Sequence, residues 1–169
     1  MKQQSQKLAL CGLTAALGTV LMVLGAALGV GMYLAPMLAG LCLLPAGRTW
    51  GVKYHLLLWV AVSLLSFMLV ADPEQNLMFI GLFGWYPALR PKLQQFPKIP
   101  RFCVKLMLFN AVILALEALI MLVLVPETME TGAILLLLLL GNITFLLYDL
   151  AIPRMEFILR RHLKKFFPK

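Results

Sequence analysis

Long apolar stretches that are nearly free of charge are the feature that most constrains this chain. The clearest lie at residues 8–30, 54–71, 104–125 and 133–147. An α-helix needs roughly 18 to 20 apolar residues to cross the hydrocarbon core of a bilayer. Hydrophobic residues make up 62% of the 169 positions, which is more apolar surface than one small soluble core can bury. A lipid bilayer is therefore the solvent that suits this sequence.

We expect an all-α fold, an integral membrane bundle of about six transmembrane helices that occupies residues 1–151. Turn-forming residues such as Asp72-Pro73 and Pro126 separate the apolar stretches. The first stretch follows Lys2 and Lys7 but is too long for the core of a cleaved signal peptide, so we interpret it as a membrane helix at the start of the mature protein. The predicted helices span residues 7–30, 32–46, 53–71, 76–89, 102–125 and 132–150.

Two of these helices, at 32–46 and 76–89, are short for a full crossing. Pro36 lies in the first and Pro87 in the second, together with Gly81 and Gly84. Proline removes a helical hydrogen bond and glycine weakens a helix. Either segment is therefore a full span or a broken, re-entrant segment.

The placement of charge predicts the topology. With six crossings and a cytoplasmic N-terminus, all 15 lysines and arginines fall on the inside, whereas Asp72, Glu74, Glu127 and Glu130 fall outside. The positive-inside rule favours this arrangement. We predict a multi-pass protein of a bacterial plasma membrane with both termini cytoplasmic. The formal charge of +8 then belongs to the membrane surface rather than to nucleic-acid binding.

The last 18 residues, 152–169, form a basic tail that begins with Ile152-Pro153. Apolar positions recur there near helical spacing and basic residues occupy the remainder, which is typical of an interfacial amphipathic helix. We expect this helix to lie on an anionic inner leaflet, with docking of a cytoplasmic partner as the alternative. The basic side chains are Arg154, Arg160, Arg161, Lys164 and Lys165.

Polar residues within the predicted spans are the candidates for a solute site. Glu117 lies deep in the fifth helix, Asn110 precedes it by two turns, and Asn142 lies in the middle of the sixth. We predict that these three residues, with Ser63 and Ser66 of the third helix, line a small cavity for a polar or cationic solute. The structural alternative is a neutral Glu117 that makes one interhelical hydrogen bond to Asn142.

The chain carries no motif of a known catalytic or nucleotide-binding site. It has no phosphate-binding loop and no zinc or serine-nucleophile motif. His55 and His162 stand alone and are expected at the surface of the cytoplasmic side. We therefore predict that the protein is not an enzyme and uses no cofactor or metal.

Small residues at four-residue spacing line the first helix, where Gly12 pairs with Ala16 and Ala15 with Thr19. Such spacing allows close helix approach, either within the bundle or to a second membrane subunit.

This helix, the six short-looped spans and the Phe83-Gly84-Trp85-Tyr86-Pro87 segment before a basic loop resemble the substrate-binding S components of energy-coupling factor transporters. The resemblance implies a small, vitamin-like solute bound between the helices and uptake energised by separate ATPases. It also implies that Gly12, Ala15 and Ala16 dock a membrane coupling subunit. A non-transporting membrane scaffold or assembly protein with a similar fold is the alternative.

Overall fold

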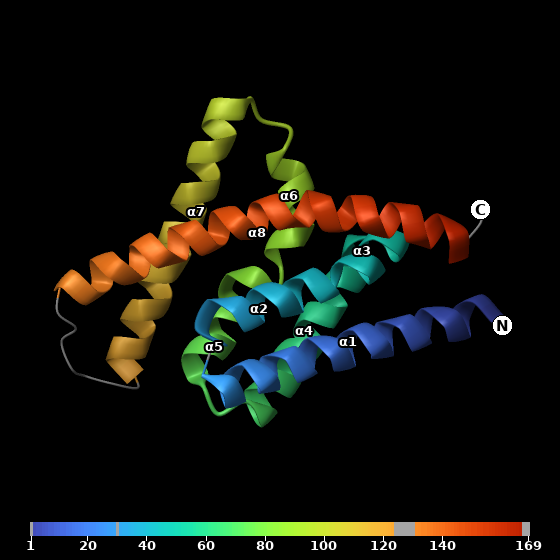
Figure 1. Cartoon of the computed structure of the whole chain (residues 1–169), viewed down its shortest axis with the longest axis horizontal. Helices are drawn as coiled ribbons and strands as arrows, with labels where there is room; N and C mark the ends of the chain where they lie inside the picture. The colour runs from blue at the N-terminus through green and yellow to red at the C-terminus, as the bar shows by residue number, and fades with distance from the viewer. Residues whose placement is uncertain (1, 30, 124–130, 167–169) are drawn as a thin grey trace.

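The computed structural model describes residues 2–29, 31–123 and 131–166, and these residues are helical apart from short turns (Figure 1). The expected all-α class is confirmed. The elements, in chain order, are α1 (Lys2–Leu28), α2 (Gly31–Cys42), α3 (Leu44–Trp50), α4 (Val52–Leu69), α5 (Pro73–Met78), the π-helix η1 (Phe79–Phe83), α6 (Tyr86–Leu93), α7 (Lys98–Val123) and α8 (Thr131–Phe166).

Four helices are long and apolar enough to cross a membrane, namely α1, α4, α7 and α8. They coincide with four of the six predicted spans. Only 22% to 28% of the most apolar window of each is buried within the protein. The apolar surface that remains exposed is unfavourable in water, whereas contact with lipid chains removes it from water.

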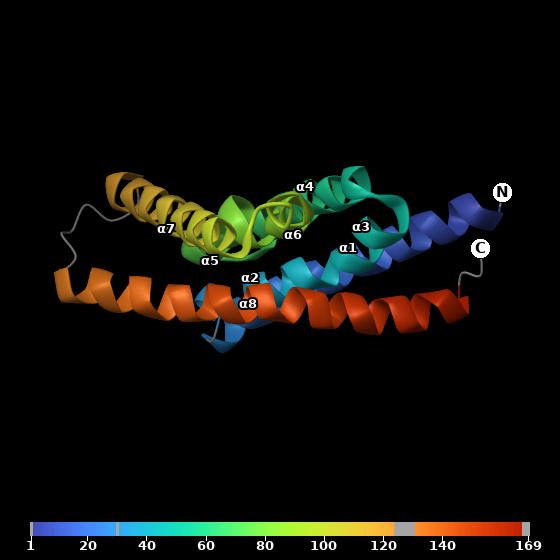
Figure 2. The same cartoon turned by 90° about the horizontal axis from the view of Figure 1, so that it is seen from above.

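The helices form two layers that are seen edge-on in Figure 2, with α4 to α7 in one layer and α1, α2 and α8 in the other. The N-terminus and the C-terminal end of α8 lie at the same end of the molecule in both views. At its C-terminal end, beside α5, α1 turns back into α2 through Gly29, whose φ of 65° favours glycine.

The two short predicted spans are both broken. The segment predicted at 32–46 forms α2, which ends at Cys42, and then the separate helix α3. The segment predicted at 76–89 forms α5, η1 and α6 in succession. The chain is interrupted where Gly84 follows the π-helix and Pro87 cannot donate a helical hydrogen bond. Both segments are therefore interrupted helices, as one of the two alternatives predicted, and their path across the membrane stays a prediction.

Side chains from other helices bind the carbonyls that this break leaves free. Pro87 has no N–H for the Phe83 carbonyl, and the Tyr148 hydroxyl donates to that carbonyl at 2.6 Å. The Ala88 N–H bonds to Trp85 instead of Gly84, and the His55 Nε2 lies 2.9 Å from the Gly84 carbonyl. The main core surrounds this break, because Phe83, Tyr86, Phe109, Phe145 and Tyr148 are all fully buried or nearly so.

The last helix continues past the point where a break was predicted. α8 runs from Thr131 to Phe166 with Pro153 inside it, so the tail extends the same helix rather than starting a new one. Ile152 is fully buried, and Met155 and Leu159 pack against the core. The first turns of the predicted interfacial helix therefore contact protein. Arg154 and Arg161 are exposed, whereas the side chains of Arg160, Lys164 and Lys165 lie outside the described part of the chain.

Arg48, Arg90 and Lys105 gather along the C-terminal half of α8, and we call this region the basic end of the molecule. Asp149 pairs with Arg90 of α6 and Lys105 of α7, and Glu156, two turns further on, pairs with Arg48 of α3. Asp72 and Glu74 lie at α5, beside the C-terminal half of α1, to which Gln75 bonds through the Met22 carbonyl. We call the region around Asp72 and Glu74 the acidic end.

Candidate functional site

The predicted polar seam between α7 and α8 contains a closed amide pair. Asn110 Nδ2 donates to Asn142 Oδ1 at 3.1 Å, and Asn142 Nδ2 donates to Asn110 Oδ1 at 2.9 Å. Each amide also donates to the carbonyl one turn earlier in its own helix. Both amides are therefore satisfied by each other, and the hydrogen bond considered between Asn142 and Glu117 is replaced by the bond to Asn110.

Glu117 lies two turns beyond this pair, toward the acidic end. The residue is buried, with 7% of its surface exposed, and its Oε1 has no hydrogen-bond partner among the described residues. The hydroxyl of Tyr33 on α2 is also buried without a partner in that part of the chain. Tyr33 interacts electrostatically with Glu117 and with Glu74 of α5. Tyr33 and Glu117 thus each place a buried oxygen without a described partner in this part of the bundle, on α2 and on α7.

The predicted serines belong to a different part of the bundle. Ser63 and Ser66 lie on α4, which packs mainly against α1 and α3 and makes no extended contact with the described residues of α7 or α8. Both hydroxyl oxygens are buried and lack partners among the described residues. The structure therefore does not bring these serines to the amide pair.

The small residues of α1 divide between two faces. Gly12 and Ala16 are exposed, and a Cβ added at Gly12 would meet no atom within 4 Å. Ala15 instead packs against the core cluster that contains Met22, Leu43 and Val62. Gly12 and Ala16 thus form a smooth outward strip one turn apart, with exposed Leu8, Leu13 and Leu17 beside it.

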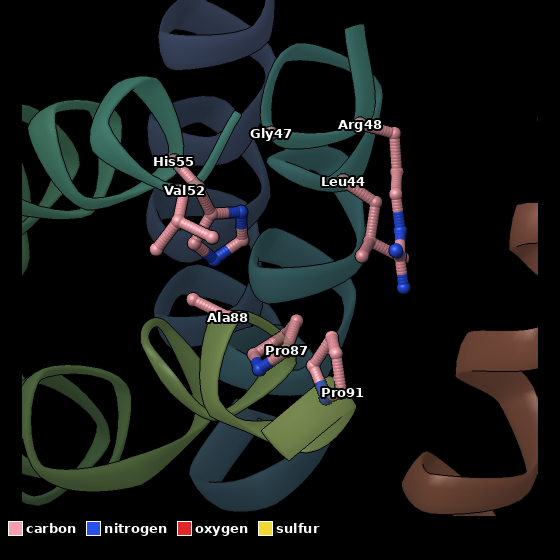
Figure 3. A pocket seen from close by; sticks show the side chains of 8 residues that line it. All are labelled: Leu44, Gly47, Arg48, Val52, His55, Pro87, Ala88 and Pro91. Carbon is pink, nitrogen blue, oxygen red and sulfur yellow. The ribbon is translucent and has the colours of Figure 1, made fainter. Parts of the chain in front are cut away.

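A small cavity opens between α3, α4 and α6 near His55 (Figure 3). Its volume of about 40 Å³ holds a few water molecules and is far below the size of a small-molecule site. Figure 3 shows the ring of His55 beside Val52, opposite Pro87 and Pro91. His55 was expected at the surface, but it is buried at 2% exposure because it caps the Gly84 carbonyl. The prediction for this residue is wrong.

The most heavily bonded polar group of the described residues is the Asp149 carboxylate. Lys105 Nζ contacts its two oxygens at 2.8 and 2.7 Å, Arg90 Nε donates at 2.9 Å, and the Tyr86 hydroxyl donates at 2.8 Å. Asp149 follows Asn142 by seven residues near the cytoplasmic end of its helix, where either Arg154 or Arg90 was anticipated as its partner, and Arg90 is the one that pairs. Lys105 and Tyr86 were not anticipated, because their approach depends on how α6 and α7 cross α8.

Comparison with protein-family models, curated proteins and solved structures finds no match to this chain. In the described ranges, no group of three or more His, Cys, Asp or Glu side chains is arranged to hold a metal ion.

Proposed function

We propose that this is a multi-pass membrane protein that captures a small polar or cationic solute for uptake energised by separate subunits. Four helices with the length and composition of membrane spans support the membrane assignment. The largely uncovered apolar surface of each supports it as well.

The observation that carries the solute proposal is the pair of buried polar atoms on Glu117 and Tyr33. Buried polar atoms without partners are rare, and a buried carboxyl in a membrane is costly unless it is neutralised, paired or hydrated. Glu117 Oε1 and the Tyr33 hydroxyl both lack partners in the described part of the chain. A ligand with an amine or several hydroxyl groups satisfies them, and the carboxyl group of Glu117 favours a cationic one.

The position of this group along the bundle also supports uptake. Glu117 lies twelve residues, about 18 Å of helix, beyond Lys105 of the basic end. The positive-inside rule favours a cytoplasmic basic end, so the acidic end faces outward. Capture of a solute from outside requires binding groups in the outward-facing half of the bundle, which is where Glu117 lies in this orientation.

The exposed strip of Gly12 and Ala16 supports docking of a membrane partner. Small residues allow two helix backbones to approach closely, which is the main source of helix association in lipid. This strip and the resemblance to energy-coupling factor S components favour a coupling subunit with separate ATPases as the partner.

The test is purification of the tagged protein in mild detergent, with mass spectrometry of bound small molecules and of co-purifying subunits. We expect a bound solute that falls at least about tenfold in Glu117→Gln and in Tyr33→Phe, since each change removes a charged or buried hydrogen bond. Thr144→Val is the control, because Thr144 bonds only within its own helix. A wild-type protein with neither a solute nor ATPase subunits would overturn the proposal.

A non-transporting scaffold is the second candidate, and the Asn110–Asn142 pair favours it, because the pair closes the α7–α8 seam at that level. In a scaffold, partner binding through α1 or the basic tail is the function. Gly12→Leu then removes both partner and activity, whereas Glu117→Gln changes neither.

A further inference from the structure

A cavity of about 220 Å³ lies at the basic end, where the turn between α6 and α7 meets α8. It is several times larger than the cavity near His55, and it has room for a phosphate group with its hydrating waters. The lining side chains are Arg90, Gln94, Lys98, Arg101, Phe102, Lys105 and Asp149.

The charges that line this cavity do not balance. Four of the side chains are cations and one is a carboxylate, which leaves three excess positive charges. Arg90 and Lys105 are buried, at 8% and 6% exposure, and they share the single carboxylate of Asp149. Burying like charges together is unfavourable unless a counter-charge is present.

Asp149 is the only acidic side chain of the described residues that lines this cavity. Of the seven acidic residues of the chain, Glu156 pairs with Arg48, and Asp72 and Glu74 lie at the acidic end. Glu117 is twelve residues from Lys105 along α7, and the remaining two, Glu127 and Glu130, follow the far end of that helix. Among the described residues the cavity therefore keeps an excess of positive charge, with Arg90 and Lys105 buried at its base and Lys98 and Arg101 more exposed.

The cations are arranged to surround one anion. Lys98, Arg101 and Lys105 follow one another at spacings of three and four residues, so they share one face of α7. They occupy the first two turns of this 26-residue helix, where the helix dipole adds further positive potential. Arg90 faces them from α6.

We infer that this cavity binds a phosphate group, with Lys98 and Arg101 as its direct ligands and the Arg90–Lys105–Asp149 cluster as its base. Guanidinium and ammonium groups are the usual ligands of phosphate in proteins. Apolar side chains on the same turn, Phe96, Ile99 and Phe102, are half exposed or more, which favours the headgroup of a phospholipid whose acyl chains they contact. The inference does not depend on the proposed uptake of a solute at the acidic end.

The test uses the full chain reconstituted in phosphatidylcholine nanodiscs that contain a graded fraction of phosphatidylglycerol. Bound phosphatidylglycerol is counted by native mass spectrometry after release from the nanodisc. A second arm adds glycerol 3-phosphate to protein in pure phosphatidylcholine, so that a lipid headgroup and a soluble phosphate are distinguished. The variant is Lys98→Gln/Arg101→Gln, which leaves the Asp149 cluster intact.

The matched control is Lys53→Gln/Lys92→Gln, which removes the same charge from two exposed lysines outside the cavity. We expect the cavity variant to lose at least about tenfold in affinity for the phosphate ligand, because each lost ligand is a charge-assisted hydrogen bond. Lys98→Arg/Arg101→Lys, which keeps both charges, is expected to bind within a few-fold of wild type.

Retention of phosphatidylglycerol that is lost only in the cavity variant supports a lipid site. Binding of glycerol 3-phosphate with the same dependence supports a soluble phosphate ligand at the same site. Equal losses in the cavity and control variants, or no binding of either probe to wild type, would overturn the inference.

Discussion

Arg90 replaces the hydrogen bond that Pro153 removes from α8. The proline has no N–H to donate to the Asp149 carbonyl four residues earlier, and Arg90 Nη2 donates to that carbonyl at 3.3 Å. Helix-breaking residues are tolerated in membrane helices where neighbouring groups bond to the backbone atoms they leave free. The same arginine also forms an ion pair with the Asp149 carboxylate. One residue therefore both bonds to the free carbonyl of α8 and neutralises an acidic side chain of that helix.

This relationship predicts energetic coupling between Arg90 and Pro153. Arg90→Met is expected to destabilise the protein by about 1–3 kcal/mol, since it removes bonds to a partly buried acidic group. In a Pro153→Ala background the cost is expected to fall by about 0.5–1.5 kcal/mol, because the alanine N–H then bonds to the Asp149 carbonyl. Reversible unfolding in mixed detergent measures both. Arg48→Met, which affects another ion pair on α8, is the control, and an Arg90 cost that is unchanged by Pro153→Ala would contradict the coupling.

Gly40 is predicted to be intolerant of any side chain. A Cβ at this position would lie 2.3 Å from the Phe83 carbonyl oxygen and 2.5 Å from the Tyr148 hydroxyl, two atoms that are hydrogen-bonded to each other. Gly40→Ala is therefore expected to cost at least about 2 kcal/mol in unfolding free energy. Gly12→Ala, with no neighbour within 4 Å, is expected to be neutral or stabilising by up to about 1 kcal/mol. Equal thermal stabilities of the two variants in detergent would contradict the packing described at Gly40.

Hydropathy and turn residues were enough to predict the long helices. The lengths of α1, α4 and α7 follow from apolar runs that end at glycine, proline or charged residues, and these are local properties of the sequence. The weakness of the segment at 76–89 was also visible in Gly81, Gly84 and Pro87. Both kinds of signal reside in consecutive residues, which is why a single sequence reveals them.

The bonds that repair the broken helices could not be predicted in this way. Tyr148 and His55 cap carbonyls 65 and 29 residues away in the chain. The continuity of α8 through Pro153 depends in the same way on Arg90, which is 59 residues from Asp149. These partners are set by how the helices pack, and no spacing within one helix encodes them.

Glu74 is predicted to make stability depend on pH. Burial raises the pKa of the Glu74 carboxyl above its usual 4.5, and the nearby Asp72 carboxylate raises it further. Because the pKa is higher in the folded than in the unfolded state, protonation of Glu74 stabilises the fold. This contribution is fully present below pH 4.5 and is lost as the pH rises through the folded-state pKa. Glu74→Gln is therefore expected to melt at a higher temperature than wild type at pH 7 and at the same temperature near pH 4. A difference that is independent of pH would argue against this assignment.

The positive-inside arrangement predicts which ends are accessible from each side of the membrane. After replacement of Cys11, Cys42 and Cys103 by serine, a cysteine at Gln95 is expected to react with a membrane-impermeant maleimide only in inside-out vesicles. A cysteine at Glu74 is expected to react in right-side-out cells. Labelling of both positions from the same side would rule out a crossing by the broken segment between them.

The Asn110–Asn142 pair allows a structural role to be separated from solute binding. Replacing either residue alone by leucine leaves the other amide, which is partly buried, without its partner, at an expected cost of about 1–2 kcal/mol. The double variant leaves no unpaired amide and is expected to recover at least half of the summed cost, because two apolar side chains pack well between these helices. Unfolding free energies of the four proteins, measured in the same detergent, give the coupling directly. Additive costs would mean that each amide acts independently of the other. If the double variant still binds the solute, capture is assigned to Glu117 and Tyr33 rather than to this pair.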